Sequence, residues 1–168
     1  DGIADLVFEV EAEGPYGEER PEIWMSFGPF DGDRDMQEPD AWILHDDDWH
    51  YPFEIGDLDA DGLPDLAVKQ SGPGARLYLL HGPFEGGVDL DLAAAMVGFH
   101  GEEDLDRNYL PDAVLGPGDL DGDGDNDLAV VDTSLALGGG AHLFHGPLEG
   151  EIEQDAHLVV TTDPEAGG

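Results

Sequence analysis

The sequence predicts an all-β fold assembled from repeated, four-stranded sheets. Its 168 residues include 25 Gly and 12 Pro, which divide the chain into short apolar segments. An Asp-rich motif recurs about every 60 residues, and a Gly-Pro motif follows each copy in the same order. Short strands that end at Gly and Pro, in units of fixed period, are typical of all-β repeat architectures.

The Asp-rich motif is present in two complete copies and one partial copy. Residues 57–68 read DLDADGLPDLAV and residues 119–130 read DLDGDGDNDLAV, while residues 1–7 match the second half of both. The Gly-Pro motif occupies residues 27–30, 81–84 and 145–148. Two motifs in the same order indicate three repeat units. We place these units at residues 1–49, 50–110 and 111–168.

Each complete unit has room for four strands. In the middle unit the apolar segments that predict strands are residues 50–55, 66–68, 75–80 and 92–99. Residues 90–97 also suit a helix, because Ala93-Ala94-Ala95 has high helix propensity. The equivalent residues 40–44 and 157–161 are rich in β-formers, which favours a strand. Four strands in each of several units predict the antiparallel blades of a partial β-propeller.

The Asp-rich loops have the composition of a site for a hard divalent cation. Such cations bind six to eight oxygen atoms, and Gly at the sixth position allows the turn that brings alternate side chains together. A solvated acidic turn is the alternative, but the repetition of the whole motif favours a cation site. The predicted ligands are the carboxylates of Asp57, Asp59, Asp61, Asp65, Asp119, Asp121, Asp123 and Asp127, the carbonyls of Leu63 and Asp125, and Asp1 and Asp5 of the partial copy.

A helix-loop-helix calcium site begins with a similar Asp-x-Asp-x-Asp-Gly pattern. That loop requires a bidentate Glu at its twelfth position, where this chain has Val68 and Val130. Apolar segments of strand character also flank both loops. The helix-loop-helix interpretation is therefore excluded.

Residues 56–68, with Leu77-Tyr78-Leu79-Leu80-His81-Gly82-Pro83 downstream, resemble the FG-GAP repeat of integrin α-subunit β-propellers and their bacterial relatives. The resemblance implies that each Asp-rich loop joins the first two strands of a blade and holds Ca²⁺. It also implies a ring of about seven blades. Since the first unit begins inside its loop, we expect further blades from a longer protein or from neighbouring chains.

The charge of the chain limits its partners. The sequence has 41 Asp and Glu against 5 Lys and Arg, for a net charge of −36. Such a surface repels nucleic acid and anionic lipid, so neither is an expected partner. No apolar run approaches the ~20 residues of a membrane span, and no Cys is present for thiolate chemistry. The loops hold only a minority of the acids, and the rest suggest a surface suited to high salt.

Several residues outside the loops are candidates for other roles. His45, His50 and the three Asp between them suit either a transition-metal site or an acidic connector between blades. We expect His81 and His145 to serve packing or the turn, since the first unit has Phe27 at that position. Trp24 and Trp42 are expected in the core, while Trp49 is left open between core and sugar stacking.

No catalytic motif of a hydrolase, phosphate-binding loop or metalloprotease is present in the sequence, so we do not expect an enzyme. The expected function is binding of a protein or glycan, adhesion or assembly by a calcium-stabilised propeller that is secreted or on the cell surface. The alternatives are an accessory or catalytic propeller of a carbohydrate-active enzyme, and a structural subunit of an extracellular fibre.

Overall fold

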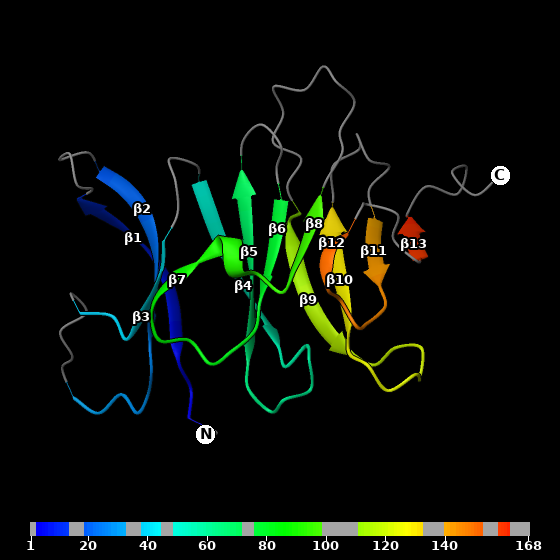
Figure 1. Ribbon diagram of the computed structural model, residues 1–168, viewed down its shortest axis with the longest axis horizontal. Helices are drawn as coiled ribbons and strands as arrows, with labels where there is room; N and C mark the ends of the chain where they lie inside the picture. The colour runs from blue at the N-terminus through cyan, green and yellow to red at the C-terminus, as the bar shows by residue number, and fades with distance from the viewer. Residues whose placement is uncertain are drawn as a thin grey trace, which may run out of the picture.

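The strands of the chain form three separate sheets (Figure 1). The computed structural model describes residues 3–13, 19–32, 38–44, 49–71, 76–98, 111–132, 140–152 and 158–161. Within these residues the fold is all-β, as predicted, with one short 3₁₀ helix. The elements are β1(Leu6–Glu13), β2(Glu19–Ser26), β3(Ala41–Leu44), β4(Trp49–Gly56), β5(Asp65–Ser71), β6(Arg76–Leu80), β7(Gly86–Asp89), η1(Leu90–Leu92), β8(Ala95–Gly98), β9(Ala113–Gly118), β10(Asp127–Asp132), β11(Gly140–Phe144), β12(Gly150–Ile152) and β13(Leu158–Thr161).

The three sheets follow one another in chain order across the molecule. Sheet 1 has the strand order β1-β2-β3-β7, sheet 2 has β12-β8-β6-β5-β4, and sheet 3 has β13-β11-β10-β9. The sheets are open, and the loops that connect β4 to β5 and β9 to β10 lie at the same end of the molecule in Figure 1. Strands expected at residues 40–44, 50–55, 66–68 and 157–161 are confirmed as parts of β3, β4, β5 and β13.

The sheets are not purely antiparallel and four-stranded, so this part of the sequence prediction is wrong. Strand β7 pairs in parallel with β3 of sheet 1, and β12 pairs in parallel with β8 of sheet 2. Both strands follow a Gly-Pro turn, after which the chain crosses to the preceding sheet. The crossing begins at an equivalent hydrogen bond each time, from Gly86 N to Asp40 O at 3.2 Å and from Gly150 N to Ala94 O at 2.9 Å.

The alternative of a helix over residues 90–97 is also wrong. Only Leu90–Leu92 is helical, as one 3₁₀ turn, and its first turn is capped by the Asp89 side chain, which accepts a hydrogen bond from Asp91 N. The Ala94 amide donates to Leu79 O at 2.9 Å, which returns the chain to sheet 2 before β8 begins. Pairing with a neighbouring strand therefore outweighs the helix propensity of the alanines.

Two apolar cores lie between the three sheets. The sheet 1–sheet 2 core contains Ile23, Met25, Ala41, Ile43, Leu66, Val68, Leu80 and Leu90. The sheet 2–sheet 3 core contains Ile55, Leu58, Ala67, Leu77, Leu79, Ala95, Val97, Val114, Leu128, Val130, Phe144 and Leu148. Strand β5 contributes to both cores with alternate residues, because successive side chains of a strand point to opposite faces. Sheet 2 is therefore covered on both faces.

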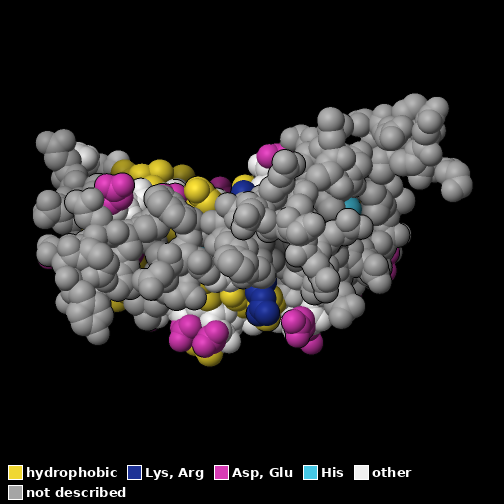
Figure 2. Space-filling view, turned by 90° about the horizontal axis from the view of Figure 1, so that it is seen from above, with side chains coloured by type: hydrophobic (Ala, Val, Ile, Leu, Met, Phe, Trp, Pro, Cys, Tyr) yellow, Lys and Arg dark blue, Asp and Glu magenta, His cyan; other side chains and the backbone are white. Residues whose placement is uncertain are grey.

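Trp24 and Trp42 do not lie in either core, contrary to expectation. They alternate along β2 and β3 with the buried Ile23, Met25 and Ile43, and so they point to the opposite face of sheet 1. Both are half-buried. Hydrophobic side chains reach the surface in the left half of Figure 2, where sheet 1 lies.

Strands β4 and β9 approach each other closely at Gly116. A Cβ atom added to Gly116 would overlap the carbonyl oxygen of Ile55 in the neighbouring sheet. Glycine at this position therefore lets two strands of different sheets pack backbone against backbone.

We expect Gly116→Ala to lower the free energy of unfolding by at least about 2 kcal/mol, because the backbone of β4 must shift. Gly150→Ala is the control, since it places a Cβ in open space at a φ of 72°. Its cost should be only about 1 kcal/mol, from the left-handed backbone alone. Urea unfolding followed by tryptophan fluorescence measures both, and equal losses would contradict the close approach.

Candidate metal centre

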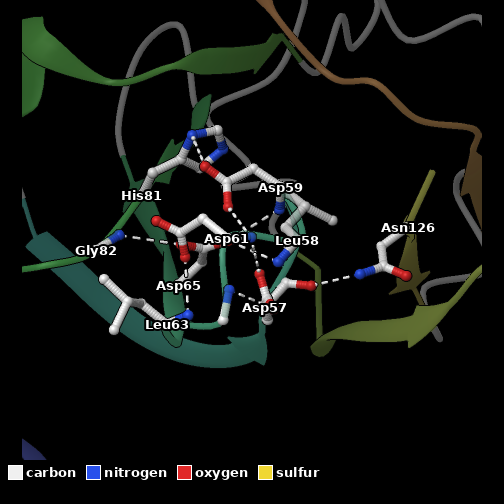
Figure 3. Close-up of polar contacts among 10 residues, drawn as sticks. Asp57, Leu58, Asp59, Asp61, Leu63, Asp65, His81, Gly82 and Asn126 are labelled. Carbon is white, nitrogen blue, oxygen red and sulfur yellow. Dashed lines mark hydrogen bonds and ion pairs between the residues drawn. The ribbon is translucent and has the colours of Figure 1, made fainter.

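The loop between β4 and β5, termed loop A (residues 57–65), folds its acidic side chains onto its own backbone (Figure 3). The Asp57 carboxylate accepts hydrogen bonds from Asp61 N at 3.0 Å and from Gly62 N at 2.9 Å. Asp59 Oδ1 also accepts from Asp61 N, at 3.1 Å, and Asp61 Oδ1 accepts from Leu63 N at 2.8 Å. These bonds hold the side chains at the first, third and fifth loop positions on the inside of the turn.

The loop between β9 and β10, termed loop B (residues 119–127), repeats this arrangement. Asp119 Oδ2 accepts from Gly124 N at 3.0 Å, as Asp57 does from Gly62. Asp121 Oδ1 accepts from Asp123 N at 3.1 Å, and Asp123 Oδ1 accepts from Asp125 N at 2.9 Å. Three of these bonds thus recur at equivalent positions, while Asp119 Oδ1 accepts from Gly122 N at 2.6 Å where Asp57 Oδ1 accepts from Asp61 N.

Each loop gathers three carboxylates that could hold a metal ion. One oxygen from each member lies within 4.8 Å of the others in the group Asp57, Asp59 and Asp61, and in the group Asp119, Asp121 and Asp123. All six side chains reach solvent, so a cation has access to them. A set of carboxylate oxygens fits a hard divalent cation and lacks the thiolates that softer metals prefer.

The ninth position of each loop is buried and has a different environment. Asp65 is 2% exposed, and its Oδ2 accepts from Leu58 N at 2.6 Å and from Asp59 N at 3.3 Å. Its Oδ1 accepts from Gly82 N, in the Gly-Pro turn, at 3.0 Å. Asp65 therefore joins the start of loop A to the turn that follows β6.

The other two units repeat this connection. Asp127 is fully buried and accepts from Leu120 N at 2.6 Å and from Gly146 N at 3.1 Å. In the partial unit, Asp5 Oδ1 accepts from Gly28 N at 2.8 Å. The ninth aspartate thus connects to the Gly-Pro turn in every unit.

The pKa values of the two buried carboxyls move in opposite directions. Burial raises the pKa of Asp65 above its ordinary value, and the amides of Gly82 and Leu58 offset this only in part. Burial also raises the pKa of Asp127, but hydrogen bonds from two amides and the nearby His145 together hold it below the ordinary value. The contrast is consistent with His145 Nδ1 lying 3.5 Å from Asp127 Oδ1.

His81 and His145 each contact the aspartate at the third position of their loop. His81 Nδ1 lies 3.0 Å from Asp59 Oδ2, and His145 Nδ1 lies 3.1 Å from Asp121 Oδ2. With Asp127, Asp121 and His145 form a third group whose ligand atoms could hold a metal ion. The sequence pattern predicts a packing or turn role for these histidines and does not predict their contact with Asp. Their recurrence after both complete loops was the available signal.

Loops A and B are also connected to each other. Asn126 Nδ2 donates to the Asp57 carbonyl at 2.6 Å, so the end of loop B is hydrogen-bonded to the start of loop A (Figure 3). The sequence pattern predicts no role for Asn126. The two candidate sites are therefore neighbours at one end of sheets 2 and 3.

The remaining sequence-predicted residues are described only in part. The amides of Leu63 and Asp125 take part in the loop hydrogen bonds. Asp1 lies outside the described residues, as do residues 45–48 of the His-Asp cluster. His50 is buried in β4, at 1% exposure, whereas nothing is described of the Trp49 side chain.

Comparison of the chain with protein-family models, curated proteins and solved structures finds no match. In the part of the chain that the structure describes, no helix has the length and apolar character required to cross a membrane. The chemistry of the loops is therefore inferred from the residues of this chain alone.

We expect Asp127→Ala to destabilise the metal-free protein by about 3 kcal/mol, since the amides of Leu120 and Gly146 lose a buried, charged acceptor. Asp123→Ala removes an exposed carboxylate of the same loop and should cost far less. Urea unfolding in the presence of a chelator measures both variants. Equal losses in the free energy of unfolding would show that the buried connection to the Gly-Pro turn contributes no more to stability than an exposed carboxylate of the loop.

Proposed function

We propose that the chain is a calcium-binding, FG-GAP-like segment of a β-propeller that acts in binding or assembly outside the cell. The observation that carries this proposal is the duplication of one loop geometry, with three convergent carboxylates in each copy. In both loops the carboxylates at the first, third and fifth positions lie close enough together to share one cation.

Calcium is the cation that best suits these loops. It accepts irregular sets of carboxylate and carbonyl oxygens, whereas Mg²⁺ demands near-ideal octahedral geometry and retains water. Each group brings three formal negative charges within 4.8 Å, so a divalent cation would relieve their mutual repulsion. Asp57, Asp59 and Asp61 would hold the ion in loop A, and Asp119, Asp121 and Asp123 would hold it in loop B.

The arrangement of the sheets supports assignment as propeller blades. The three sheets follow chain order and pack face to face through two apolar cores. The first strands of sheets 2 and 3, β4 and β9, approach each other closely at Gly116. Blades arranged around an axis bring corresponding strands together in this way.

A binding function fits the position of the loops and the charge of the chain. Loop A and loop B lie side by side at one end of the sheets, where bound cations would fix the backbone that a partner contacts. Extracellular calcium-binding modules operate with Kd values of about 10⁻⁴–10⁻³ M, which suits exposed sites of this type. The net charge of −36 disfavours nucleic acid and anionic membranes as that partner.

We expect calcium to raise the melting temperature of the chelated protein. An ion that binds only the folded state stabilises it by about 2.7 kcal/mol at a hundred times its Kd. The measurement is a thermal melt by circular dichroism at increasing CaCl₂, with MgCl₂ at the same ionic strength as the control for screening. A melting temperature that calcium moves no further than magnesium does would overturn the assignment of calcium.

Paired variants locate the effect. Asp61→Asn and Asp123→Asn should each reduce the calcium-dependent rise, and the double variant should abolish it. Glu149→Gln removes the same charge from an exposed residue outside both loops and should leave the rise intact. If Glu149→Gln has an equal effect, calcium acts through the general negative charge of the chain.

A further inference from the structure

The two internal junctions of the molecule follow one rule. Each sheet has a leading face, defined in sheet 2 by Leu66, Val68 and Leu80, and a trailing face on its other side, which includes Leu77 and Leu79. The leading face of sheet 2 packs on the trailing face of sheet 1. The leading face of sheet 3 packs on the trailing face of sheet 2 in the same way.

By this rule, sheet 1 has a leading face that no described sheet covers. Its residues are Leu6, Phe8, Trp24, Trp42 and Ser26, which alternate with the residues of the trailing face; Ser26 is buried, and the other four are half-buried or exposed. Leu6, at the position of the buried Leu66, is 48% exposed. Phe8 and Trp24 form an edge-to-face pair with ring centroids 6.5 Å apart. Two side chains of this face are therefore already packed on each other within a single chain.

Sheet 3 has the complementary surface. Its trailing face contains the cross-strand pairs Ala129–Leu143 and Val131–Ala141 of β10 and β11. Leu143 and Ala141 are only half-buried, whereas their equivalents in sheet 2, Leu79 and Leu77, are fully buried under sheet 3. A face of small and aliphatic side chains suits the bulky aromatic face of sheet 1.

The edge strand of sheet 3 also matches the internal pattern. Strand β13 occupies the place of β3 and β8, and each of those strands pairs with a parallel strand that follows a Gly-Pro turn of the next unit. The Gly-Pro turn of the first unit has the same form. Gly32 has a φ of 87°, at the position of Gly86 with 60° and Gly150 with 72°.

The residue after each Gly-Pro provides a further element of the junction. Leu148 is buried in the sheet 2–sheet 3 core, and Phe84 packs against the sheet 1–sheet 2 core. Their equivalent, Phe30, is 40% exposed. The apolar leading face, the positive-φ glycine and the residue after Gly-Pro are thus repeated on sheet 1, although the described residues of sheet 1 include no counterpart of β4 or β9.

We propose that sheet 1 of one copy of this chain docks on sheet 3 of a second copy, head to tail. The inference rests on the proposed packing of the sheets as blades, and it does not require the cations. Two chains of net charge −36 repel each other, so the contact should strengthen as salt shortens the screening length from about 10 Å at 0.1 M to about 3 Å at 1 M.

The test is sedimentation of the full chain, at increasing protein concentration, in about 0.1 M and about 1 M salt. We expect the mass to rise from the 18.0 kDa of one chain to at least double, with tighter association at high salt. A chain that stays at the single-chain mass in both conditions overturns the inference. A monomer that calcium still stabilises overturns the docking alone and leaves the proposed function intact.

Two variants identify the faces. Phe8→Glu on sheet 1 and Leu143→Glu on sheet 3 should each weaken self-association at least tenfold, with strand content checked by circular dichroism. Leu92→Glu changes a 79%-exposed residue of η1, outside both faces, and should associate normally. Equal weakening by Leu92→Glu would show that the added charge alone weakens association, and it would contradict the assignment of the two docking faces.

A mixture of the two variants provides an internal control for folding. Phe8→Glu keeps an intact sheet 3 face and Leu143→Glu keeps an intact sheet 1 face, so the mixture should form a heterodimer through one wild-type contact. Recovery of the dimer supports head-to-tail docking and demonstrates that both variants fold. If the mixture does not recover while both variants retain their calcium-dependent melting, the two faces do not bind each other.

Discussion

The buried aspartate at the ninth loop position is the constraint on which the repeat depends. Its carboxylate joins the start of the acidic loop to the Gly-Pro turn, in the pairs Asp65–Gly82 and Asp127–Gly146, and Asp5–Gly28 retains the link to the turn. A buried carboxylate is costly unless amides satisfy it, so the loop and the turn must form together. After the Gly-Pro turn, the chain crosses to the preceding sheet. One side chain thus couples the candidate cation site to the packing of sheets.

The exposed and buried aspartates of each loop therefore have separate tasks. Asp57, Asp59 and Asp61 reach solvent and converge, which keeps oxygen atoms accessible to a cation. Asp65 is buried and accepts a hydrogen bond from the backbone amide of Leu58. This division explains how a loop with several carboxylates can be ordered, because backbone amides donate hydrogen bonds to them and His81 Nδ1 lies beside Asp59.

The sequence predicted the features that local patterns encode. Short apolar segments located β4, β5 and β8, and the repeated aspartates located both loops. It did not predict β7 or β12, which have only four and three residues. Strands so short carry little periodic signal, and their pairing with the preceding sheet is a long-range contact. The same reason applies to the hydrogen bond from Asn126 to Asp57 and to the contact of His81 with Asp59. Trp24 was misplaced because an aromatic residue in a strand suits either face equally, and only packing decides between them.

The crossing of β7 and β12 also means that the repeat in the sequence and the sheet in space are out of phase. The middle unit gives a strand to sheet 1 and receives one from the third unit. Neither the middle nor the third unit can therefore unfold without removing an edge strand from the preceding sheet. Nearest-neighbour coupling of this kind makes a repeat array unfold cooperatively. A gene duplication that copied one unit would also copy the strand that pairs with the preceding sheet. Arrays of this type can therefore gain units by simple duplication.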